Sequence, residues 1–369
     1  MKVNKISIEN FRNYSSAEVE FDPNLNVFFG MNAQGKTNLL EAVYVSSIGK
    51  SYRASKDLEL VKWNEPFFRV KTDVKRDPLD VTLEIALSRD GKKIARVDGK
   101  PVRPSGLNDS LKIVIFTPED LNLVKGSPSY RRNFVDMEIS QVNPNYKHWA
   151  SVYNKAVLNR NVVLKRISED RANFNLLDSL TEQIVDLGSR IMVKRLEFIE
   201  SISQMADLSH KQISGGKDDL NVIYHPSFKF DFSCKYEEVK EEFKRNLDNI
   251  RKIEVIRGTT LFGPHRDDIS FEIGGMDVQT YGSQGQQRSV VLSLKVAELD
   301  FINLMTEDSA VFLLDDVLSE LDEKRRDHLM DKAIIKYQTL ITTADLDCCR
   351  FLPSGCRKFE VSEGHILAK

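Results

Sequence analysis

The sequence predicts an α/β fold with a parallel core sheet, an adjoining antiparallel β layer and a second, mainly helical lobe. Three observations support this prediction. A glycine-rich run at residues 30–37 lies between a short apolar strand and a helix. A second apolar run, residues 310–316, ends in two carboxylates, which is typical of a buried parallel strand. Between these segments, residues 126–255 repeat apolar side chains at three- and four-residue intervals, as helices do.

Strands and tight turns dominate the first 125 residues. Asp90-Gly91 and Asp98-Gly99 are dipeptides typical of hairpin turns. We therefore expect part of this region to form an antiparallel layer beside the parallel core. The strands that the sequence predicts here span residues 2–8, 19–21, 26–29, 81–87, 93–97 and 111–116.

Residues 30–37 fit the pattern G-x-x-x-x-G-K-[ST] at every fixed position. Gly30 and Gly35 let the backbone turn successive N–H groups toward phosphate oxygens, and the helix that follows adds the partial positive charge of its N-terminus. We expect Lys36 to reach the β- and γ-phosphates and the Thr37 hydroxyl to bind Mg²⁺. A glycine turn with a surface lysine is the alternative. The other residues expected to contact the nucleotide from this loop are Asn32, Ala33, Gln34 and Asn38.

The apolar run that ends in Asp315 and Asp316 predicts a strand that delivers a metal ligand to the edge of the sheet. We expect Asp315 to bind Mg²⁺, and Asp316 to orient or deprotonate the attacking water. The alternative is that the two carboxylates only cap the next helix, since Asp favours N-caps. That alternative does not explain why the preceding strand is uniformly apolar.

Residues 281–288 form a Gly/Ser/Gln loop before an apolar helix and resemble the signature loop of ABC ATPases, Leu-Ser-Gly-Gly-Gln. Ser283, Gly285 and Gln286 match it, whereas Gly282 and Gln284 depart from the leucine and the first glycine. In that family the signature of one subunit closes over the γ-phosphate bound to another, so the resemblance implies dimerisation with ATP. The alternative is an ordinary loop before a helix.

The resulting fold class is a P-loop NTPase of ABC-ATPase head type with an antiparallel β layer and a second, mainly helical lobe.

Two further segments agree with this resemblance. Residues 319–322 resemble the D-loop, and the strand 340–343 ends in Thr343 where ABC transporters carry His. A hydroxyl would then sense the γ-phosphate, and Asp316 replaces the usual catalytic Glu. The shorter side chain places its carboxylate on the order of 1.5 Å further from the water, and such a displacement can cost about 10²-fold in rate. We therefore expect slow hydrolysis that acts as a switch.

Six motifs occur in order along nearly the whole chain, at residues 8–14, 30–37, 116–121, 126–132, 263–268 and 282–288. Together they resemble the RecF family of bacterial DNA replication and repair ATPases. The resemblance implies an ABC-type head related to structural-maintenance-of-chromosomes proteins, without their long coiled coils. It also implies ATP-dependent dimers that bind double- and single-stranded DNA at gaps or junctions, and the partners RecO and RecR. Arg12 maps onto an Arg that lies against the nucleotide, while no Gln stands near residues 117–121 to form a glutamine loop.

Helical periodicity in the middle of the chain predicts a discontinuous ATPase domain, residues 1–125 and 256–369, with a helical insertion lobe at 126–255. Two arms of that lobe would each reach no more than about 50 Å at 1.5 Å per residue. A short strand is predicted at residues 220–224.

A formal net charge of −2 over 369 residues leaves no global attraction to DNA, so any DNA contact must come from a local patch. A solvated helix face explains such charges equally well. The candidate patch residues are Lys50, Arg53, Lys56, Lys165, Arg166, Lys194 and Arg195.

The cysteines and the termini indicate a cytoplasmic location. Cys234, Cys348, Cys349 and Cys356 form no C-x-x-C pair, which favours reduced thiols. The N-terminus lacks the apolar region of a signal peptide, and no run approaches the ~20 apolar residues that span a bilayer, so we expect no membrane contact.

Three functional classes remain open. The leading one is a DNA-binding ATPase, the second is the ATPase subunit of another machine such as a membrane transporter, and the third is a P-loop kinase acting on a small molecule. A transporter subunit does not need the helical insertion, and a kinase does not need the signature loop.

Overall fold

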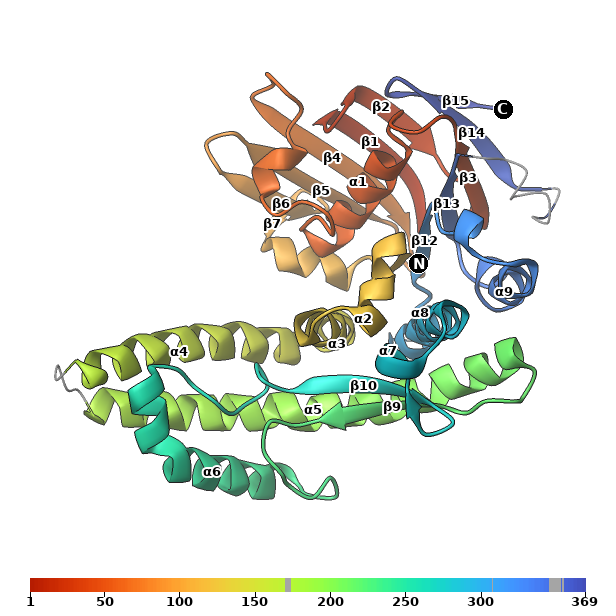
Figure 1. The fold of residues 1–369 in the computed structure, drawn as a ribbon. Helices are drawn as coiled ribbons and strands as arrows, with labels where there is room; N and C mark the ends of the chain where they lie inside the picture. The colour runs from red at the N-terminus through yellow and green to blue at the C-terminus, as the bar shows by residue number, and fades with distance from the viewer. Residues whose placement is uncertain (170–173, 307, 345–352, 354) are drawn as a thin grey trace. The chain divides into compact units, whose positions relative to one another are not determined.

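The structure is a computed structural model that describes the chain except for residues 170–173, 307, 345–352 and 354. The described residues form two compact units (Figure 1). The first comprises Met1–Asp120 and Leu292–Lys369, and the second comprises Leu121–Val291. The boundary at residue 291 falls within helix α8 (Gln284–Thr306).

A six-stranded sheet in the order β15-β14-β3-β13-β12-β8 forms the core of the first unit. All neighbours are parallel except β15, which runs antiparallel to β14. Every residue of β12 and β13 is buried, as expected for strands covered on both faces. The carboxyl ends of β3, β13 and β12 therefore meet at one edge. The strands are β3 (Leu25–Phe29), β8 (Ile113–Phe116), β12 (Val311–Asp315), β13 (Thr339–Thr343), β14 (Arg357–Ser362) and β15 (His365–Ala368).

A second six-stranded sheet in the order β2-β1-β4-β5-β6-β7 is the predicted antiparallel layer. The sequence analysis did not predict β4, although its burial alternates along the strand. It pairs with both β1 and β5 and so occupies the middle of the sheet. The strands are β1 (Lys2–Phe11), β2 (Tyr14–Glu20), β4 (Phe67–Lys75), β5 (Val81–Ser88), β6 (Lys93–Val97) and β7 (Lys100–Val102).

Helix α1 (Lys36–Ile48) lies between these two sheets. It contacts β1, β4 and β5 of the antiparallel sheet and β8, β12 and β13 of the parallel sheet. Its side chains are buried around most of its circumference, because a helix covered on both sides has no solvent-facing stripe. The helix that follows the glycine-rich loop is therefore held firmly by both sheets. The short helix α9 (Glu323–Leu329) also belongs to this unit.

Long helices and a small sheet make up the second unit. Helix α5 packs against α4, α6 and strand β9, and Figure 1 shows α4 and α5 running side by side. The helices are α2 (Asn122–Lys125), α3 (Pro128–Val142), α4 (Pro144–Ser168), α5 (Phe174–Ser214), α6 (Tyr236–Arg257) and α7 (Val278–Tyr281). The antiparallel sheet has the order β11-β10-β9 and contains β9 (Leu220–His225), β10 (Asp268–Ile273) and β11 (Met276–Asp277).

Two features of the second unit differ from the sequence-based expectation. Helix α5 has 41 residues, about 60 Å at 1.5 Å per residue. The limit of about 50 Å for each arm was wrong, because one unbroken helix of 41 residues runs through the insertion. Residues 256–291 also group with this unit, since β10 pairs along β9 and β9 packs on α5.

Neither Cys234 nor Cys356 forms a disulfide, whereas Cys348 and Cys349 lie outside the described residues. Among the described helices, none combines the length and the apolar character needed to cross a bilayer.

Candidate nucleotide-binding site

The glycine-rich loop after β3 adopts a backbone that only glycine accommodates at two positions. Gly30 has φ +151° and Gly35 has φ +115°. A Cβ atom on Gly30 would lie 2.3 Å from the carbonyl oxygen of Val361, and one on Gly35 would lie 2.5 Å from the Asn13 amide nitrogen. Because both positions are crowded by neighbouring atoms, side chains are excluded there on steric as well as conformational grounds.

Two turns brace the loop from outside. From the β1–β2 turn, the Asn13 amide donates to the Gln34 carbonyl oxygen at 3.0 Å, and the Tyr14 hydroxyl donates to the Gly35 carbonyl oxygen at 2.9 Å. From the β14–β15 turn, the Glu363 N–H donates to Gln34 Oε1 at 2.6 Å. Sequence analysis included residues 8–14 among the motifs and assigned a role only to Arg12. The structure adds that Asn13 and Tyr14 hold the loop in shape.

Lys36 lies at the base of a cavity of about 380 Å³ in the first unit. Its Nζ donates to the carbonyl oxygens of Gly30 and Met31 at 2.7 and 2.8 Å. Burial lowers the pKa of Lys36, while Asp316 and Asp315 act in the opposite direction. The cavity is lined by Asn32, Ala33, Gly35, Lys36, Thr37, Asn38, Arg53 and Asp316.

Asp315 lies at the end of β12 and is 6% exposed. Its Oδ1 accepts from the Thr37 and Thr342 hydroxyls, each at 2.8 Å, and its Oδ2 accepts from Tyr52 at 3.0 Å. Burial is the main cause that raises the pKa of Tyr52, and Asp315 adds to it, so the phenol stays a donor. The predicted pair of metal ligands, Thr37 and Asp315, is therefore in direct contact.

Asp316 adopts a left-handed backbone conformation, with φ 56°. Its N–H donates to the Thr342 hydroxyl at 3.0 Å and to the Thr342 carbonyl oxygen at 3.2 Å. Burial raises the pKa of its carboxyl group, although Lys36 lowers it. Positive φ is uncommon outside glycine and is often found at functional sites. Asp316 lines the cavity together with Lys36.

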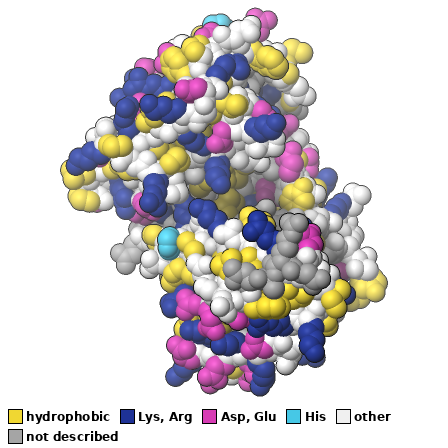
Figure 2. Space-filling model, turned by 90° about the vertical axis from the view of Figure 1, so that its left-hand side faces the viewer, with side chains coloured by type: hydrophobic (Ala, Val, Ile, Leu, Met, Phe, Trp, Pro, Cys, Tyr) yellow, Lys and Arg dark blue, Asp and Glu magenta, His cyan; other side chains and the backbone are white. Residues whose placement is uncertain are grey.

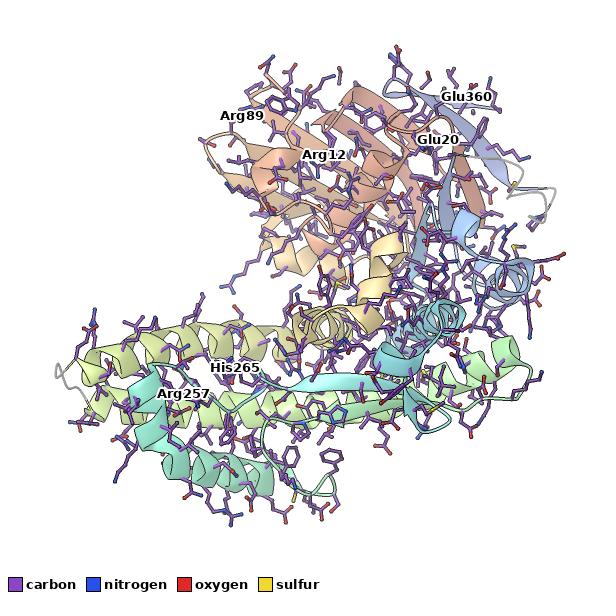
Figure 3. The ribbon with its side chains drawn as sticks, viewed as in Figure 1. Arg12, Glu20, Arg89, Arg257, His265 and Glu360 are labelled. Atoms are coloured by element: carbon purple, nitrogen blue, oxygen red, sulfur yellow. The ribbon has the colours of Figure 1, made fainter. Side chains whose placement is uncertain are left out.

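Arg12 contacts helix α1, whereas the family resemblance implies that it lies against the nucleotide. It forms a bidentate ion pair with Glu41 on α1, with both nitrogen–oxygen distances at 2.8 Å, and this pair is the main cause that raises the pKa of Arg12. Figure 3 shows Arg12 beside α1. Glu41 also accepts from the Ser51 hydroxyl at 2.5 Å, so Arg12 is linked to the loop that carries Tyr52 and Arg53. Arg12 does not line the cavity.

Arg53 is a site residue that sequence analysis assigned to another role. The structure places it at the rim of the cavity, where its guanidinium donates to Asn38 Oδ1 at 3.4 Å. The signal in the sequence was its position in a basic segment shortly after α1. Ser51 accepts from the N–H groups of Arg53 and Ala54 at 2.9 and 2.7 Å, which fixes the turn that presents the arginine.

Comparisons with known proteins agree with this geometry. Residues 2–351 match the family described as the RecF/RecN/SMC N-terminal domain. A DNA replication and repair protein RecF from Shouchella clausii is 45% identical over 93% of this chain and 92% of its own length. The corresponding protein of Halalkalibacterium halodurans is 42% identical over 94% of both chains. The chain belongs to the RecF family.

A solved structure of the recombination mediator protein RecF with ATP, of the RecFOR pathway, superposes on this RecF-family chain with a TM-score of 0.93. It is 33% identical and covers 100% of this chain and 97% of its own. The Smc head domain of Pyrococcus furiosus, at 15% identity and a TM-score of 0.58, shares the fold. The predicted fold class and the resemblance to the RecF family are thus confirmed.

In this RecF-family chain, Thr343 is buried and pairs with Phe29 at the end of β3. It does not line the cavity, and Thr342 is the residue that bonds to both Asp315 and Asp316. Sequence analysis did not single out Thr342, because its role depends on which face of β13 meets β12. The proposed role of Thr343 as a phosphate sensor stays a prediction.

The signature residues of this RecF-family chain lie in the second unit. The Gln286 N–H donates to the Ser283 hydroxyl oxygen at 3.2 Å, and the Ser283 N–H donates to Gln286 Oε1 at 2.9 Å. This reciprocal arrangement is a capping box at the start of α8. Gly285 lies between these two residues in the first turn of α8.

The candidate DNA-binding patches need one correction. Arg195 is only 3% exposed, and it is paired with Asp136 at 2.9 Å, so it does not form part of a surface patch. Lys194 pairs with Glu197 on the same helix at 2.5 Å. On the face shown in Figure 2, Lys and Arg side chains are interspersed with Asp and Glu. This mixture agrees with the nearly balanced net charge.

Proposed function

We propose that this chain is an ATP-dependent DNA-binding ATPase of recombinational repair and replication, in which slow hydrolysis acts as a switch. The principal support is the cavity in which Lys36 and Asp316 lie together, beside the contact between Thr37 and Asp315. A relative of the same family has been solved with ATP, and other relatives are named DNA replication and repair proteins.

The residues of the cavity fit a triphosphate. The loop leaves room for phosphate because Gly30 and Gly35 carry no side chain, and the start of α1 has no side-chain cap. Lys36 now donates to two loop carbonyls, and we infer that these bonds give way to the β- and γ-phosphates. Arg53 adds a second cation at the rim. The other proposed contacts are Asn32, Ala33, Gln34 and Asn38 from the loop, and Arg12 is proposed to position the cavity through its pair with Glu41.

Thr37 and Asp315 would hold Mg²⁺, because hydroxyl and carboxylate oxygens are the ligands this ion prefers. When bound, Mg²⁺ would neutralise charge on the phosphates. Thr342 and Tyr52 donate to Asp315 and so keep its carboxylate oriented toward Thr37. These donors take up some of its lone pairs, which restricts how the carboxylate can turn.

Asp316 is the proposed acceptor of the proton from the attacking water. Its backbone bonds to Thr342 fix the start of the side chain, while burial raises its pKa and makes it a better proton acceptor than an exposed Asp. The short side chain limits its reach toward the water, which is the basis of the slow rate. Thr343 is proposed to act at the same end of β13.

A second copy of the chain completes the site in this proposal. In the loop that contains Ser283, Gly285 and Gln286, the Ser283 hydroxyl oxygen already accepts a backbone N–H. The proton of this hydroxyl remains available to bind an anion. Residues of this loop would contact the γ-phosphate bound by the partner copy. The resulting dimer would clamp DNA at gaps or junctions in the cytoplasm and act with RecO and RecR to load recombinase.

Sedimentation with and without ATP tests the proposal. The wild-type chain should convert from monomer to dimer with ATP, whereas Lys36→Ala should fail to bind ATP and Ser283→Arg should bind ATP without dimerising. Lys56→Ala and Gln212→Arg are matched controls at exposed positions and should behave as wild type. Dimers that persist unchanged in Lys36→Ala or Ser283→Arg would contradict the composite site.

A further inference from the structure

A second cavity lies entirely within the second unit and has no role in the proposed ATPase. Its volume is about 220 Å³, and residues of α3, α4 and α5 line it together with residues of the segment before β10. Figure 3 shows His265, one of its lining residues, beside α5. The lining residues are Ser129, Arg132, Asn133, Asp136, Ala150, Tyr153, Asn154, Ile191, Arg195, Pro264 and His265.

Two family motifs meet at this cavity, residues 126–132 and residues 263–268. Arg131 forms a bidentate pair with Asp268 at 2.8 and 2.9 Å, and Arg132 donates to the Asp267 carbonyl oxygen at 2.7 Å. Arg195 donates to the Pro264 carbonyl oxygen at 2.6 Å. The motifs thus form one rigid frame around a hollow, although they are more than a hundred residues apart in the chain.

Two carboxylates of this frame already accept several hydrogen bonds. Asp136 accepts from Arg195 through Nε and NH2 at 3.0 and 2.9 Å, and also from the Tyr146 hydroxyl. Asp267 is fully buried and accepts from the Tyr224 hydroxyl and the Ser227 N–H. Asp267 does not line the cavity, and Asp136, which does, is held by Arg195 and Tyr146.

Arg132 differs from the other arginines of the frame. Among the described residues it forms no ion pair with a carboxylate, and its only hydrogen bond is the one from NH1 to Asp267. Burial is the main cause that lowers its pKa and the nearby Arg195 adds to it, while Asp268, Asp267 and Asp136 act in the opposite direction. Nε and NH2 are left to bind a ligand, and a guanidinium presents them in a planar fork suited to an oxyanion.

Neutral side chains line the same cavity as this guanidinium. The exposed amides of Asn133 and Asn154 form no side-chain hydrogen bond within the described part of the chain, and both line the cavity. His265 donates from Nε2 to the Thr260 carbonyl oxygen at 3.3 Å, and its Nδ1 therefore accepts from the Tyr153 hydroxyl at 2.7 Å. The His265 ring is therefore neutral, and the one carboxylate among the lining residues, Asp136, is paired with Arg195.

We propose that this cavity binds one phosphate group, with Arg132 as the bidentate donor and Asn133 and Asn154 as neutral donors. Phosphate fits better than carboxylate because it offers oxygens for the two amides after the guanidinium has taken two. Arginine and asparagine are common donors to nucleic-acid phosphates. The source is either the backbone of DNA, in which case the site rests on the function proposed above, or a free phosphate compound.

Calorimetry with inorganic phosphate tests the site directly. The protein is saturated with ADP so that the first cavity is filled, and the ionic strength is matched with chloride. Wild type and the control Gln212→Glu should bind one phosphate. Arg132→Gln and Asn154→Asp should each bind phosphate at least about tenfold more weakly, which is the loss expected for a charge-assisted hydrogen bond. Equal binding by wild type and both cavity variants, or no binding by wild type, would overturn the proposal.

The variants also separate folding from binding. Arg132→Gln removes the donor to Asp267, whereas Asn154→Asp changes only an exposed rim residue, so unchanged thermal unfolding of Asn154→Asp keeps the test valid. Gln212 is 17 residues beyond Arg195 on α5, on the order of 25 Å away. That distance exceeds the Debye length of ~8 Å at physiological salt, so its added charge is screened from the cavity.

The salt dependence of DNA binding identifies the source of the phosphate. If the site holds a backbone phosphate, Arg132→Gln should reduce the slope of log K against log salt by about 0.9 for duplex or about 0.7 for single strands. An unchanged slope with lost phosphate binding would assign the site to a free phosphate compound. Absence of DNA binding by wild type would contradict the proposed function and leave the calorimetric result on the site unaffected.

Discussion

Two adjacent aspartates at the end of β12 serve one cavity because the backbone turns between them. Successive side chains of a strand point to opposite faces, which would separate Asp315 from Asp316. The positive φ of Asp316 interrupts this alternation. Asp315 therefore contacts Thr37, while Asp316 lines the same cavity near Lys36. A single unusual dihedral thus brings together the proposed metal ligand and the proposed base.

Replacing Asp316 with Asn tests its role in hydrolysis. The variant should bind ATP, hydrolyse it much more slowly and accumulate as the ATP-bound dimer, because an amide cannot accept the proton. Steady-state hydrolysis and sedimentation measure the two effects. Loss of ATP binding in the variant would assign Asp316 a structural role.

The pH dependence of hydrolysis follows from the same residue. A base must be ionised, and burial raises the pKa of Asp316 above the ordinary value of 3.8. The rate should therefore fall on acidification, starting at a higher pH than for an exposed Asp. A kcat profile of wild type should show this decline, while the residual rate of Asp316→Asn should not depend on the same ionisation.

His265 should make the protein sensitive to acid. Burial lowers its pKa from 6.5 to about 4, so below pH 6.5 the unfolded chain binds a proton that the folded chain does not. Folding stability is therefore lost as the pH falls from 6.5 toward 4, by about 2 kcal/mol at pH 5. Urea unfolding of wild type and His265→Gln at pH 7.5 and pH 5 measures this loss. An equal loss in the variant would assign the acid sensitivity to other groups.

At the scale of elements, the turn between β1 and β2 and the start of α1 form one support for the nucleotide loop. Asn13 and Tyr14 bind the backbone of the glycine-rich loop. The neighbouring Arg12 binds Glu41 on α1, and Glu41 binds Ser51. The first strands of the chain thus position both sides of the cavity without lining it, and Arg12 is a positioning residue in this structure.

A double-mutant cycle tests this support. Arg12→Met should cost about 3–5 kcal/mol, because it leaves the fully buried Glu41 without its partner. The double variant Arg12→Met with Glu41→Met should recover much of that loss, since no uncompensated charge remains. Urea unfolding measures stability, and ATP affinity should fall in the double variant because Ser51 loses its bond to Glu41. ATP affinity equal to wild type in the double variant would show that the connection to Arg53 is unimportant.

At the scale of the whole molecule, segments from opposite ends of the sequence build the first unit. The bond between Thr37 and Asp315 joins residues 278 positions apart, and Val3 and Gln338 exchange two hydrogen bonds across 335 positions. Such contacts form only when both halves of the chain are folded. The nucleotide site therefore depends on the second unit being inserted without disturbing the parallel sheet.

DNA should accelerate ATP hydrolysis if the two activities belong to one machine. In the presence of ATP the dimer should bind DNA more tightly than the monomer, and by linkage DNA should stabilise the dimer that assembles the catalytic site. Phosphate release measured with and without gapped duplex checks this expectation, with Lys36→Ala as the background control. A rate independent of DNA at saturating concentrations would argue against coupling.

Local sequence patterns were enough to predict the loop, the strand that ends in Asp315 and the class of fold. Gly30, Gly35 and Lys36 lie within a few residues of one another, so their chemistry is visible in the sequence alone. The capping box of Ser283 and Gln286 is also visible in the sequence alone, because the two residues are three positions apart. The family resemblance drew on such local motifs, and the comparisons confirmed it.

The tertiary structure alone decided which distant residues support these motifs. Thr342 reaches Asp315 because β13 pairs with β12 in one register, and Arg195 is buried rather than exposed because α5 packs against α4 and α3. Arg53 belongs to the nucleotide cavity because Ser51 is tied to Glu41. Burial and hydrogen bonding are properties of atoms that come together only on folding, so spacing along the chain could not predict them.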